Sequence, residues 1–320
     1  MKIVVIGATG HVGGYLVPRL VRAGHEVVAV TRGASEPYHS DPAWNRVERV
    51  FLDREAGDAA GTFAGAVAGL GADVVVDMVC FTPESASQLV EALRGRVELL
   101  VHCGTIWVHG PSAEVPITED VARTPFGEYG TGKAAIEELL LREARRPGGL
   151  RSVILHPGHI TGPGWPMINP QGNLDLSVWE ALATGGEVLL PNSGLETVHH
   201  VHADDVAQAF ERAIARQAEA AGNSFHVVSE RAITLRGFAT AIARHYCQEP
   251  NLRFVPFDEL RTLIPADSAE ASFQHASRSH SVSIERARRV LGYAPRFTTL
   301  EAVLDGLAWL RAEGRVDLPA

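Results

Sequence analysis

Two observations predict an α/β fold with a doubly wound parallel sheet. The first is a strand, a glycine-rich turn and a helix that follow one another directly over residues 2–22. The second is the alternation of short apolar runs with segments of helical apolar spacing as far as residue 103. This βαβα order is typical of parallel strands joined by right-handed crossovers. The later part of the chain is expected to add a smaller, discontinuous substrate lobe.

The first βα unit carries the most specific motif. Residues 3–6 form a β-branched apolar run, as expected of a strand buried on both faces. Gly7, Gly10 and Gly13 follow at a spacing of three. This order is the dinucleotide-binding fingerprint of a Rossmann fold, in which a helix N-terminus faces a pyrophosphate. The residues predicted to surround the cofactor phosphates are Gly7, Thr9, Gly10, His11, Val12 and Gly13.

The second strand, predicted at residues 27–31, ends next to Arg32. NAD-binding sheets place an acid at this point to hold the ribose 2′-hydroxyl. Arg32 offers a guanidinium instead, which suits a 2′-phosphate. The sequence therefore favours NADP over NAD, with a solvent-exposed arginine that binds nothing as the alternative.

Apolar runs at residues 47–52, 74–79 and 99–103 predict three further strands, with a helix at 83–93 that begins at a proline. Ligands of doubly wound sheets bind beyond the carboxyl ends of the strands. The residues expected to border this crevice are Gly7, Arg32, Asp53, Val79 and Thr105.

Tyr129 and Lys133 lie four residues apart in a predicted helix over residues 128–145, so they share one helix face. An ammonium beside a phenol favours the phenolate and lowers the phenol pKa, which makes a usable general acid or base. Thr105 follows the fifth strand and is placed to donate a hydrogen bond to the same substrate oxygen. The alternative is a tyrosine and a lysine on a hydrated helix face.

These motifs resemble the extended short-chain dehydrogenase/reductase family, in its NAD-dependent epimerase/dehydratase branch. Five further segments resemble family segments in the same order: residues 116–120, 156–164, 201–206, 225–229 and 284–295. The resemblance implies that Thr105 polarises the substrate oxygen, that Tyr129 transfers the proton, and that Lys133 holds the nicotinamide ribose. It further implies a homodimer that pairs through the helices at 83–93 and 128–145.

The resemblance also implies positions for the rest of the cofactor. Asp53, with Leu52, would receive the adenine amino group, and His156-Pro157 would begin a loop over the nicotinamide. The predicted cofactor-binding set beyond the glycine turn is Arg32, Leu52, Asp53, Val79, Lys133, His156, Pro157 and His159. The predicted substrate-binding set is Trp107, His109, His159, Trp165, Asn169, Asn173 and Arg278.

We expect residues 1–165 to form the dinucleotide-binding domain, to which 198–228 return, and 166–197 with 229–320 to form mainly the substrate lobe. Helices are predicted at 174–183, at 203–220 with Asp204 and Asp205 as caps, and at 234–246 with Thr234 as cap. Residues 267–280 are polar and low in apolar residues. They are expected to form a mobile flap over the substrate or, equally, a plain solvated loop.

His199, His200 and His202 raise the question of a metal, because alternate residues of a strand share one face. No carboxylate pattern around them completes a ligand set, so no metal is predicted. Packing or a hydrogen bond to substrate is the preferred interpretation.

The net charge, the cysteine spacing and the length of the apolar runs disfavour several classes of protein. A net charge of −9 disfavours nucleic-acid binding as the main function. The three cysteines, Cys80, Cys103 and Cys247, are widely spaced and predict neither disulfides nor a metal site. No apolar run reaches the length of a membrane span, so a cytoplasmic protein is expected.

The predicted function is an NAD(P)-dependent enzyme that moves a hydride between nicotinamide C4 and a hydroxyl- or carbonyl-bearing carbon of a small substrate, nucleotide sugars included. Ile106 and Trp107 follow Thr105 where the 4,6-dehydratases carry an Asp-Glu pair, so dehydration is disfavoured and epimerase and reductase remain. The alternatives are an NADPH-dependent reductase of a non-sugar carbonyl, and a non-catalytic cofactor-sensing or RNA-binding member of the fold.

Overall fold

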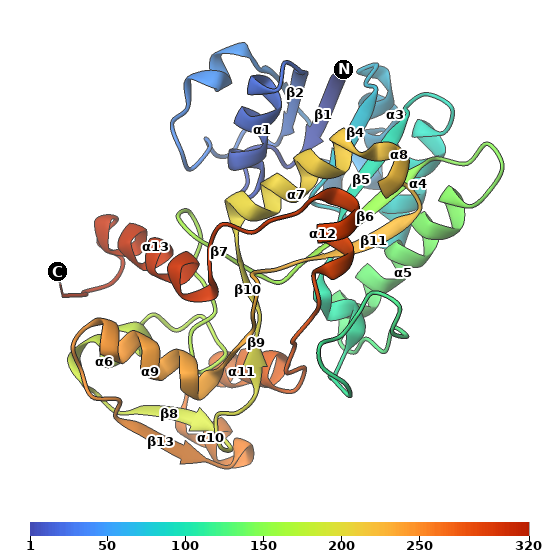
Figure 1. Cartoon of the computed structure of the whole chain (residues 1–320). Coiled ribbons are helices and arrows are strands. Elements are labelled where there is room, and N and C mark those ends of the chain that lie inside the picture. The colour runs from blue at the N-terminus through green and yellow to red at the C-terminus, as the bar shows by residue number, and fades with distance from the viewer. Residues whose placement is uncertain (320) are drawn as a thin grey trace.

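The computed structural model describes residues 1–319 and is built on one seven-stranded sheet, in which every strand pair is parallel (Figure 1). The strand order is β11-β6-β5-β4-β1-β2-β3. The strands are β1 (Lys2–Ile6), β2 (Glu26–Thr31), β3 (Glu48–Phe51), β4 (Val74–Asp77), β5 (Leu99–Cys103), β6 (Ser152–Pro157) and β11 (Asn223–Val227). The predicted doubly wound fold is confirmed.

Helices cover both faces of the sheet, and each face has its own apolar core. One core packs α1 (Gly13–Arg22), α7 (Ala203–Ala215) and α12 (Glu285–Leu291). The other core packs α3 (Phe63–Gly69), α4 (Pro83–Leu93) and α5 (Glu128–Ala144). The short helices are η1 (Pro42–Arg46), α2 (Arg54–Ala59), η2 (Ile106–His109) and α8 (Gln217–Ala220). Because the central strands are buried on both faces, their sequences are continuous apolar runs.

A third apolar core lies outside the sheet, in the group of elements drawn below it in Figure 1. We call this group the C-terminal lobe. Its helices are α6 (Ser177–Thr184), α9 (Leu235–His245), α10 (Phe257–Leu263), α11 (Ala266–Ala276) and α13 (Thr299–Ala312). Its strand pair is β8 (Val188–Pro191) with β13 (Leu252–Val255). Two short pairs lie between the sheet and the lobe: β7 (His159–Thr161) with β10 (His200–His202), and β9 (Thr197–Val198) with β12 (Ile233–Thr234).

The prediction for residues 267–280 was wrong. Residues 266–276 form helix α11, and Arg278 and His280, which follow it, are each only 1% exposed. The buried face of this helix consists of Ala269, Ser272 and Ala276. Side chains this small let a helix pack closely against its neighbours. They leave little apolar periodicity in the sequence, however. The segment is therefore neither a flap nor a solvated loop.

The predicted helix at 203–220 is divided at Arg216 into α7 and α8. Its cap is His202 rather than Asp204 or Asp205, because His202 Nδ1 accepts the Asp204 amide at 3.0 Å. Thr234 is confirmed as the N-cap of α9, because its hydroxyl accepts a hydrogen bond from the Gly237 amide at 3.1 Å. Over residues 1–319, none of the helices combines the length and the apolar character that crossing a membrane requires.

Candidate functional site

The glycine turn between β1 and α1 brings three backbone segments unusually close. Gly7 has a φ of +85°, and a Cβ there would lie 2.9 Å from Val79 Cγ1. A Cβ on Gly13 would lie 2.4 Å from the Ala8 carbonyl oxygen. A Cβ on Gly10, in contrast, would meet only the Gly7 carbonyl oxygen, at 3.2 Å, so the space beside it is open. Open space next to the unpaired amides of a helix start fits a pyrophosphate.

The glycine turn lies where the chain changes direction across the sheet. From β1 the chain builds β2 and β3 on one side, and then returns to build β4, β5 and β6 on the other. Ligands of doubly wound sheets bind at such a switch point. Thr9 and Val12 are buried beside the turn, and the His11 ring is stacked on Trp165 with their centroids 6.4 Å apart. The residues at the turn therefore fit a dinucleotide.

The ends of β2 and β3 supply the residues predicted for the adenosine half. Arg32 is exposed and makes no ion pair within the described residues 1–319. Asp53 is also exposed, and its Oδ1 caps α2 by accepting the Ala56 amide at 2.9 Å. Leu52 is half-buried against the core of α3, α4 and α5. A free guanidinium at the end of β2 fits an additional phosphate.

The predicted catalytic residues meet at the carboxyl end of β5. The Thr105 side chain caps η2 and lies close enough to Tyr129, in the first turn of α5, to lower the pKa of its phenol. Lys133 Nζ donates to the Cys103 carbonyl at 2.7 Å. The same ammonium lies 5.9 Å from the centroid of the Tyr129 ring and 4.9 Å from that of Phe81. The structure thus brings a hydroxyl, a phenol and an ammonium together.

The predicted effect of Lys133 on the Tyr129 phenol was wrong for this state of the protein. Burial raises the pKa of Tyr129 to about 12, and the nearby Thr105 only partly opposes this rise. Lys133 lies over the ring, where it contacts the π face rather than the phenol oxygen. Burial also lowers the pKa of Lys133. The phenol is therefore protonated at neutral pH.

His156 and Pro157, which were predicted to begin a loop over the nicotinamide, are the last two residues of β6. Both are buried in β6, and His156 is 0% exposed. The His156 ring lies beneath the site, where Nδ1 accepts the Thr105 amide at 3.0 Å. Nε2 of the same ring is 3.0 Å from Glu137 Oε1 in α5. His156 thus contacts a predicted catalytic residue rather than the crevice.

Aromatic rings connect Tyr129 to the C-terminal lobe. The ring centroid of Trp107 lies 5.7 Å from that of Tyr129 and 5.1 Å from that of His275 in α11. His275 lies 4.9 Å from His159, both of whose ring nitrogens are buried without a hydrogen-bond partner in the structure. Trp165, another of the predicted substrate residues, is 51% exposed. Of the predicted substrate residues, Trp107 thus adjoins Tyr129, and His159 is connected to it only through His275 and Trp107.

The other predicted substrate residues are engaged inside the protein. His109 Nε2 is 2.7 Å from His226 Nε2, and both rings are buried. Asn169 and Asn173 are buried and hydrogen-bonded to each other at 2.6 Å, where they hold their loop together. The Arg278 guanidinium lies between the Trp107 and Phe126 rings, 3.8 and 3.7 Å from their centroids. It also donates to the Phe126 carbonyl at 2.8 Å.

The three histidines near β10 all use ring nitrogens in internal hydrogen bonds. His199 Nε2 donates to the Ser229 carbonyl at 3.0 Å, and His200 Nε2 donates to the Ile168 carbonyl at 3.0 Å. His202 Nε2 lies 3.1 Å from Asp305 Oδ2. Within residues 1–319, no group of three or more His, Cys, Asp or Glu side chains is arranged to hold a metal ion.

Sequence reasoning missed three residues near the catalytic set: the buried Glu137, the half-buried Arg123 and the exposed Phe81. Glu137 follows Lys133 by four residues and Tyr129 by eight, so all three lie on one face of α5. That spacing is the signal that would have identified Glu137. Phe81 and Arg123 come from loops and carry no periodic signal.

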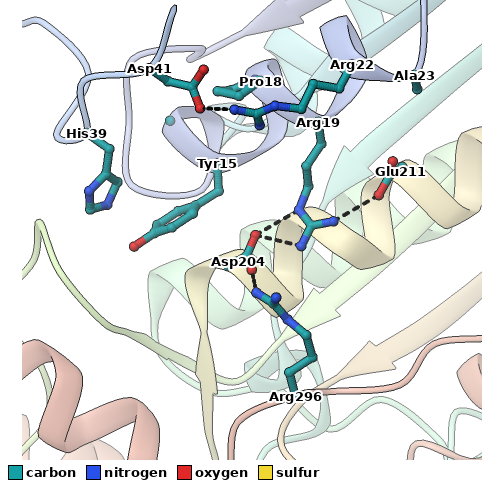
Figure 2. A pocket seen from close by; sticks show the side chains of 11 residues that line it. Tyr15, Pro18, Arg19, Arg22, Ala23, His39, Asp41, Asp204, Glu211 and Arg296 are labelled. Atoms are coloured by element: carbon teal, nitrogen blue, oxygen red, sulfur yellow. Dashed lines mark hydrogen bonds and ion pairs between the residues drawn. The ribbon is translucent and has the colours of Figure 1, made fainter. Parts of the chain in front are cut away.

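A cavity of about 580 Å³ lies beside α1 and α7 and is lined by none of the predicted site residues (Figure 2). Figure 2 shows that its arginines are all paired with acids. Arg19 contacts Asp204 at 2.7 Å and Glu211 at 3.1 Å, Arg22 contacts Asp41, and Arg296 contacts Asp204. Since each cation already has a carboxylate, this cavity offers no unpaired charge to a ligand.

Named relatives have different functions. The chain is 27% identical over 316 residues to the chloroplast stem-loop binding protein of 41 kDa b of Arabidopsis thaliana, which covers 95% of this chain and 78% of that protein. It is 29% identical to the 2′-dehydrokanamycin reductase of Streptomyces kanamyceticus, over 74% of this chain and 64% of the reductase. It is 27% identical to the UDP-glucose 4-epimerase of Mycolicibacterium smegmatis, over 97% and 99% of the two chains.

Solved structures share the fold. The UDP-glucose 4-epimerase of Thermotoga maritima, with UDP-glucose, superposes with a TM-score of 0.72 at 18% identity, over 98% of this chain and 99% of that one. The sequence model of the NAD dependent epimerase/dehydratase family matches residues 3–227, which include the sheet, the glycine turn and the three predicted catalytic residues. The chain therefore belongs to the NAD-dependent epimerase/dehydratase family.

Proposed function

We propose that this protein is an NADP-dependent enzyme that transfers a hydride to or from a carbon bearing a hydroxyl or carbonyl, with Tyr129 as the acid or base. The observation that carries the proposal is the proximity of Thr105 and Tyr129, with Lys133 one helical turn away and its ammonium 5.9 Å from the centroid of the Tyr129 ring. The cofactor supplies the hydride chemistry when it is bound, and the protein supplies orientation and proton transfer.

The roles of the chain's own residues follow from their positions. The α1 N-terminus would bind the pyrophosphate, and Arg32 the 2′-phosphate. The Thr105 hydroxyl would hold the substrate oxygen beside the Tyr129 phenol. A phenol with a pKa of about 12 carries its proton at neutral pH, which is the state needed to protonate a carbonyl oxygen. Lys133 keeps two N–H groups besides the one on Cys103, and these would bind the nicotinamide ribose.

Two substrate classes suit the site. The first is a nucleotide sugar, because the UDP-glucose 4-epimerase from M. smegmatis aligns over nearly its whole length. The second is a ketone without a nucleotide, because the 2′-dehydrokanamycin reductase aligns over three quarters of this chain. Arg32 favours net reduction, because a guanidinium at this position suits the 2′-phosphate of NADPH. We therefore place reduction of a polar, hydroxylated ketone first and epimerisation second.

Replacing Tyr129 with Phe tests the proposal. Loss of an acid–base group lowers turnover by roughly 10²–10⁴-fold. The assays follow NADPH oxidation with 2′-dehydrokanamycin and interconversion of UDP-glucose and UDP-galactose. The matched control is Tyr246→Phe at the end of α9, which should leave turnover unchanged. A Tyr129→Phe variant with wild-type turnover contradicts the mechanism.

A non-catalytic binding protein is the second candidate, because the Arabidopsis relative is named a stem-loop binding protein. The net charge of −9 opposes affinity for phosphate backbones. Titration with an RNA stem-loop at low and physiological salt tests it. Tight, salt-resistant binding, together with no turnover in either assay, would support this candidate over the enzyme.

A further inference from the structure

The backbone amide of Thr105 is held by a buried histidine. Thr105 N donates to His156 Nδ1 at 3.0 Å, and His156 is 0% exposed. This bond fixes the peptide that carries the Thr105 hydroxyl, and Thr105 lies close enough to Tyr129 to lower the pKa of its phenol. Any rotation of the His156 ring would therefore move Thr105 relative to Tyr129.

The hydrogen bonds define the tautomer of His156. A backbone N–H can only donate, so Nδ1 must be the unprotonated nitrogen of a neutral ring. Nε2 then carries the hydrogen and donates to Glu137 Oε1, 3.0 Å away. The carboxylate thus selects the one tautomer that can accept the Thr105 amide.

Glu137 is itself held in place. It is 3% exposed. Arg123 donates two hydrogen bonds to it, from Nε to Oε2 at 2.8 Å and from Nη2 to Oε1 at 2.7 Å. Burial alone would raise the pKa of Glu137, but the contacts with His156 and Arg123 place it well below the ordinary value. The carboxylate therefore stays ionised and remains an acceptor for His156.

Gly104, the residue before Thr105, leaves room for the His156 ring. A Cβ on Gly104 would lie 2.4 Å from His156 Nδ1, so glycine is what allows the ring to reach the Thr105 amide. Gly104 N is bound to the Leu155 carbonyl at 2.7 Å, which aligns the ends of β5 and β6. Glu137 lies on α5, two turns after Tyr129. The contacts thus join β5, β6 and α5 behind the site.

We infer that His156 is a positioning residue for the reaction: oriented by Glu137 and Arg123, it holds the Thr105 peptide so that the threonine hydroxyl meets the Tyr129 phenol. This inference rests on the proposed function. It predicts a role in turnover for the buried His156 and Glu137 and the half-buried Arg123, which touch neither substrate nor cofactor.

Two substitutions of His156 separate its hydrogen bonds. Asparagine places its amide oxygen near the position of Nδ1 and keeps an acceptor for Thr105. Glutamine places its amide nitrogen near the position of Nε2 and keeps the donor to Glu137, but leaves the Thr105 amide unpaired. We expect His156→Gln to lower kcat about 10- to 100-fold, the range for a buried donor left without its acceptor. His156→Asn should stay within about threefold of wild type, and KM for NADPH should not change in either variant.

A double-mutant cycle with Thr105→Ala shows whether His156 acts through Thr105. Turnover is measured with 2′-dehydrokanamycin and with UDP-galactose, and melting temperatures verify folding. We expect His156→Gln to cause no further loss once the Thr105 hydroxyl is absent. An equal further loss in the Thr105→Ala background, or His156→Asn as slow as His156→Gln, would overturn the inference. Full turnover of Thr105→Ala alone would instead overturn the proposed function.

A spectroscopic measurement on the wild-type protein tests the inference without any variant. In ¹⁵N-histidine-labelled protein, His156 should show an unprotonated Nδ1 and a protonated Nε2 at neutral pH. The Nδ1-protonated tautomer, or a charged ring, cannot accept the Thr105 amide and would overturn the inference even if no substrate is turned over.

Discussion

At the scale of single residues, the proposed preference for NADP depends on Arg32. It stands at the end of β2, where an acid would bind the 2′-hydroxyl of NAD and repel the 2′-phosphate of NADP. No acid within residues 1–319 neutralises its guanidinium. The charge is thus available to an anionic ligand, and a guanidinium binds phosphate oxygens with paired hydrogen bonds.

Replacing Arg32 with Ala should raise the Kd for NADPH about 10- to 100-fold, the value of a charged hydrogen bond, and leave the Kd for NADH unchanged. Quenching of tryptophan fluorescence measures both constants. The exposed Arg244, in α9 of the C-terminal lobe, provides the control substitution Arg244→Ala. Equal weakening of NADH and NADPH by Arg32→Ala would contradict a 2′-phosphate contact.

At the scale of elements, two adjacent glycines of α1 face different surroundings. A Cβ on Gly13 would lie 2.4 Å from the Ala8 oxygen and 2.6 Å from the Gly7 oxygen, and backbone atoms cannot give way easily. A Cβ on Gly14 would have no atom within 4 Å. The contact between the turn and the helix therefore depends on Gly13 alone.

Gly13→Ala and Gly14→Ala should change stability in opposite directions. Gly14→Ala should stabilise the protein by up to about 1 kcal/mol, because alanine is the better helix former. Gly13→Ala should destabilise it and abolish dinucleotide binding, because the turn must open. Urea unfolding and NADPH titration measure the two effects. A Gly13→Ala protein that binds NADPH normally would show that the turn does not form the phosphate site.

The elements that could be predicted from the sequence are those with a strong apolar pattern. Buried parallel strands appear as apolar runs, so β1, β2, β4 and β5 were found to within a few residues. α11 was missed because its buried face is made of Ala269, Ser272 and Ala276, which do not stand out from a polar loop. Both outcomes follow from side-chain size, because large buried apolar side chains reveal an element in the sequence and small ones do not.

Site residues could be predicted from the sequence only where they belong to a motif of fixed spacing. Thr105, Tyr129 and Lys133 follow from such a spacing, and the structure brings them together. The contact of His156 with Thr105 joins residues 51 positions apart, and no local pattern encodes it. His109 was assigned to the substrate from its place in a motif, but His226 occupies it instead.

At the scale of the whole molecule, the protein buries an unusual number of neutral histidines. Seven that are at most 2% exposed have lowered pKa values, with burial as the first cause: His102, His109, His199, His200, His202, His226 and His280. The pKa is lowered to about 3 for His109 and to about 4 for His200. In the unfolded chain these rings titrate near 6.5.

This difference makes stability depend on pH in a defined direction. A base whose folded pKa is lowered contributes its full stability above the unfolded pKa, and the contribution is lost as the pH falls toward the folded pKa. Each such histidine contributes a slope of about 1.4 kcal/mol per pH unit below pH 6.5. The melting temperature should therefore fall steeply between pH 7 and pH 5. The exposed His245 gives the control His245→Gln, which should keep the same profile. A constant melting temperature over this range would contradict the neutral state of these rings.

The position of β11 at the end of the sheet has a consequence for biosynthesis. Its partner β6 is complete at Pro157, but β11 is supplied only by residues 223–227. Until the ribosome has made the intervening chain, one side of β6 presents unpaired amides and carbonyls to its surroundings. A nascent chain is thus open to pairing with other strands for this interval.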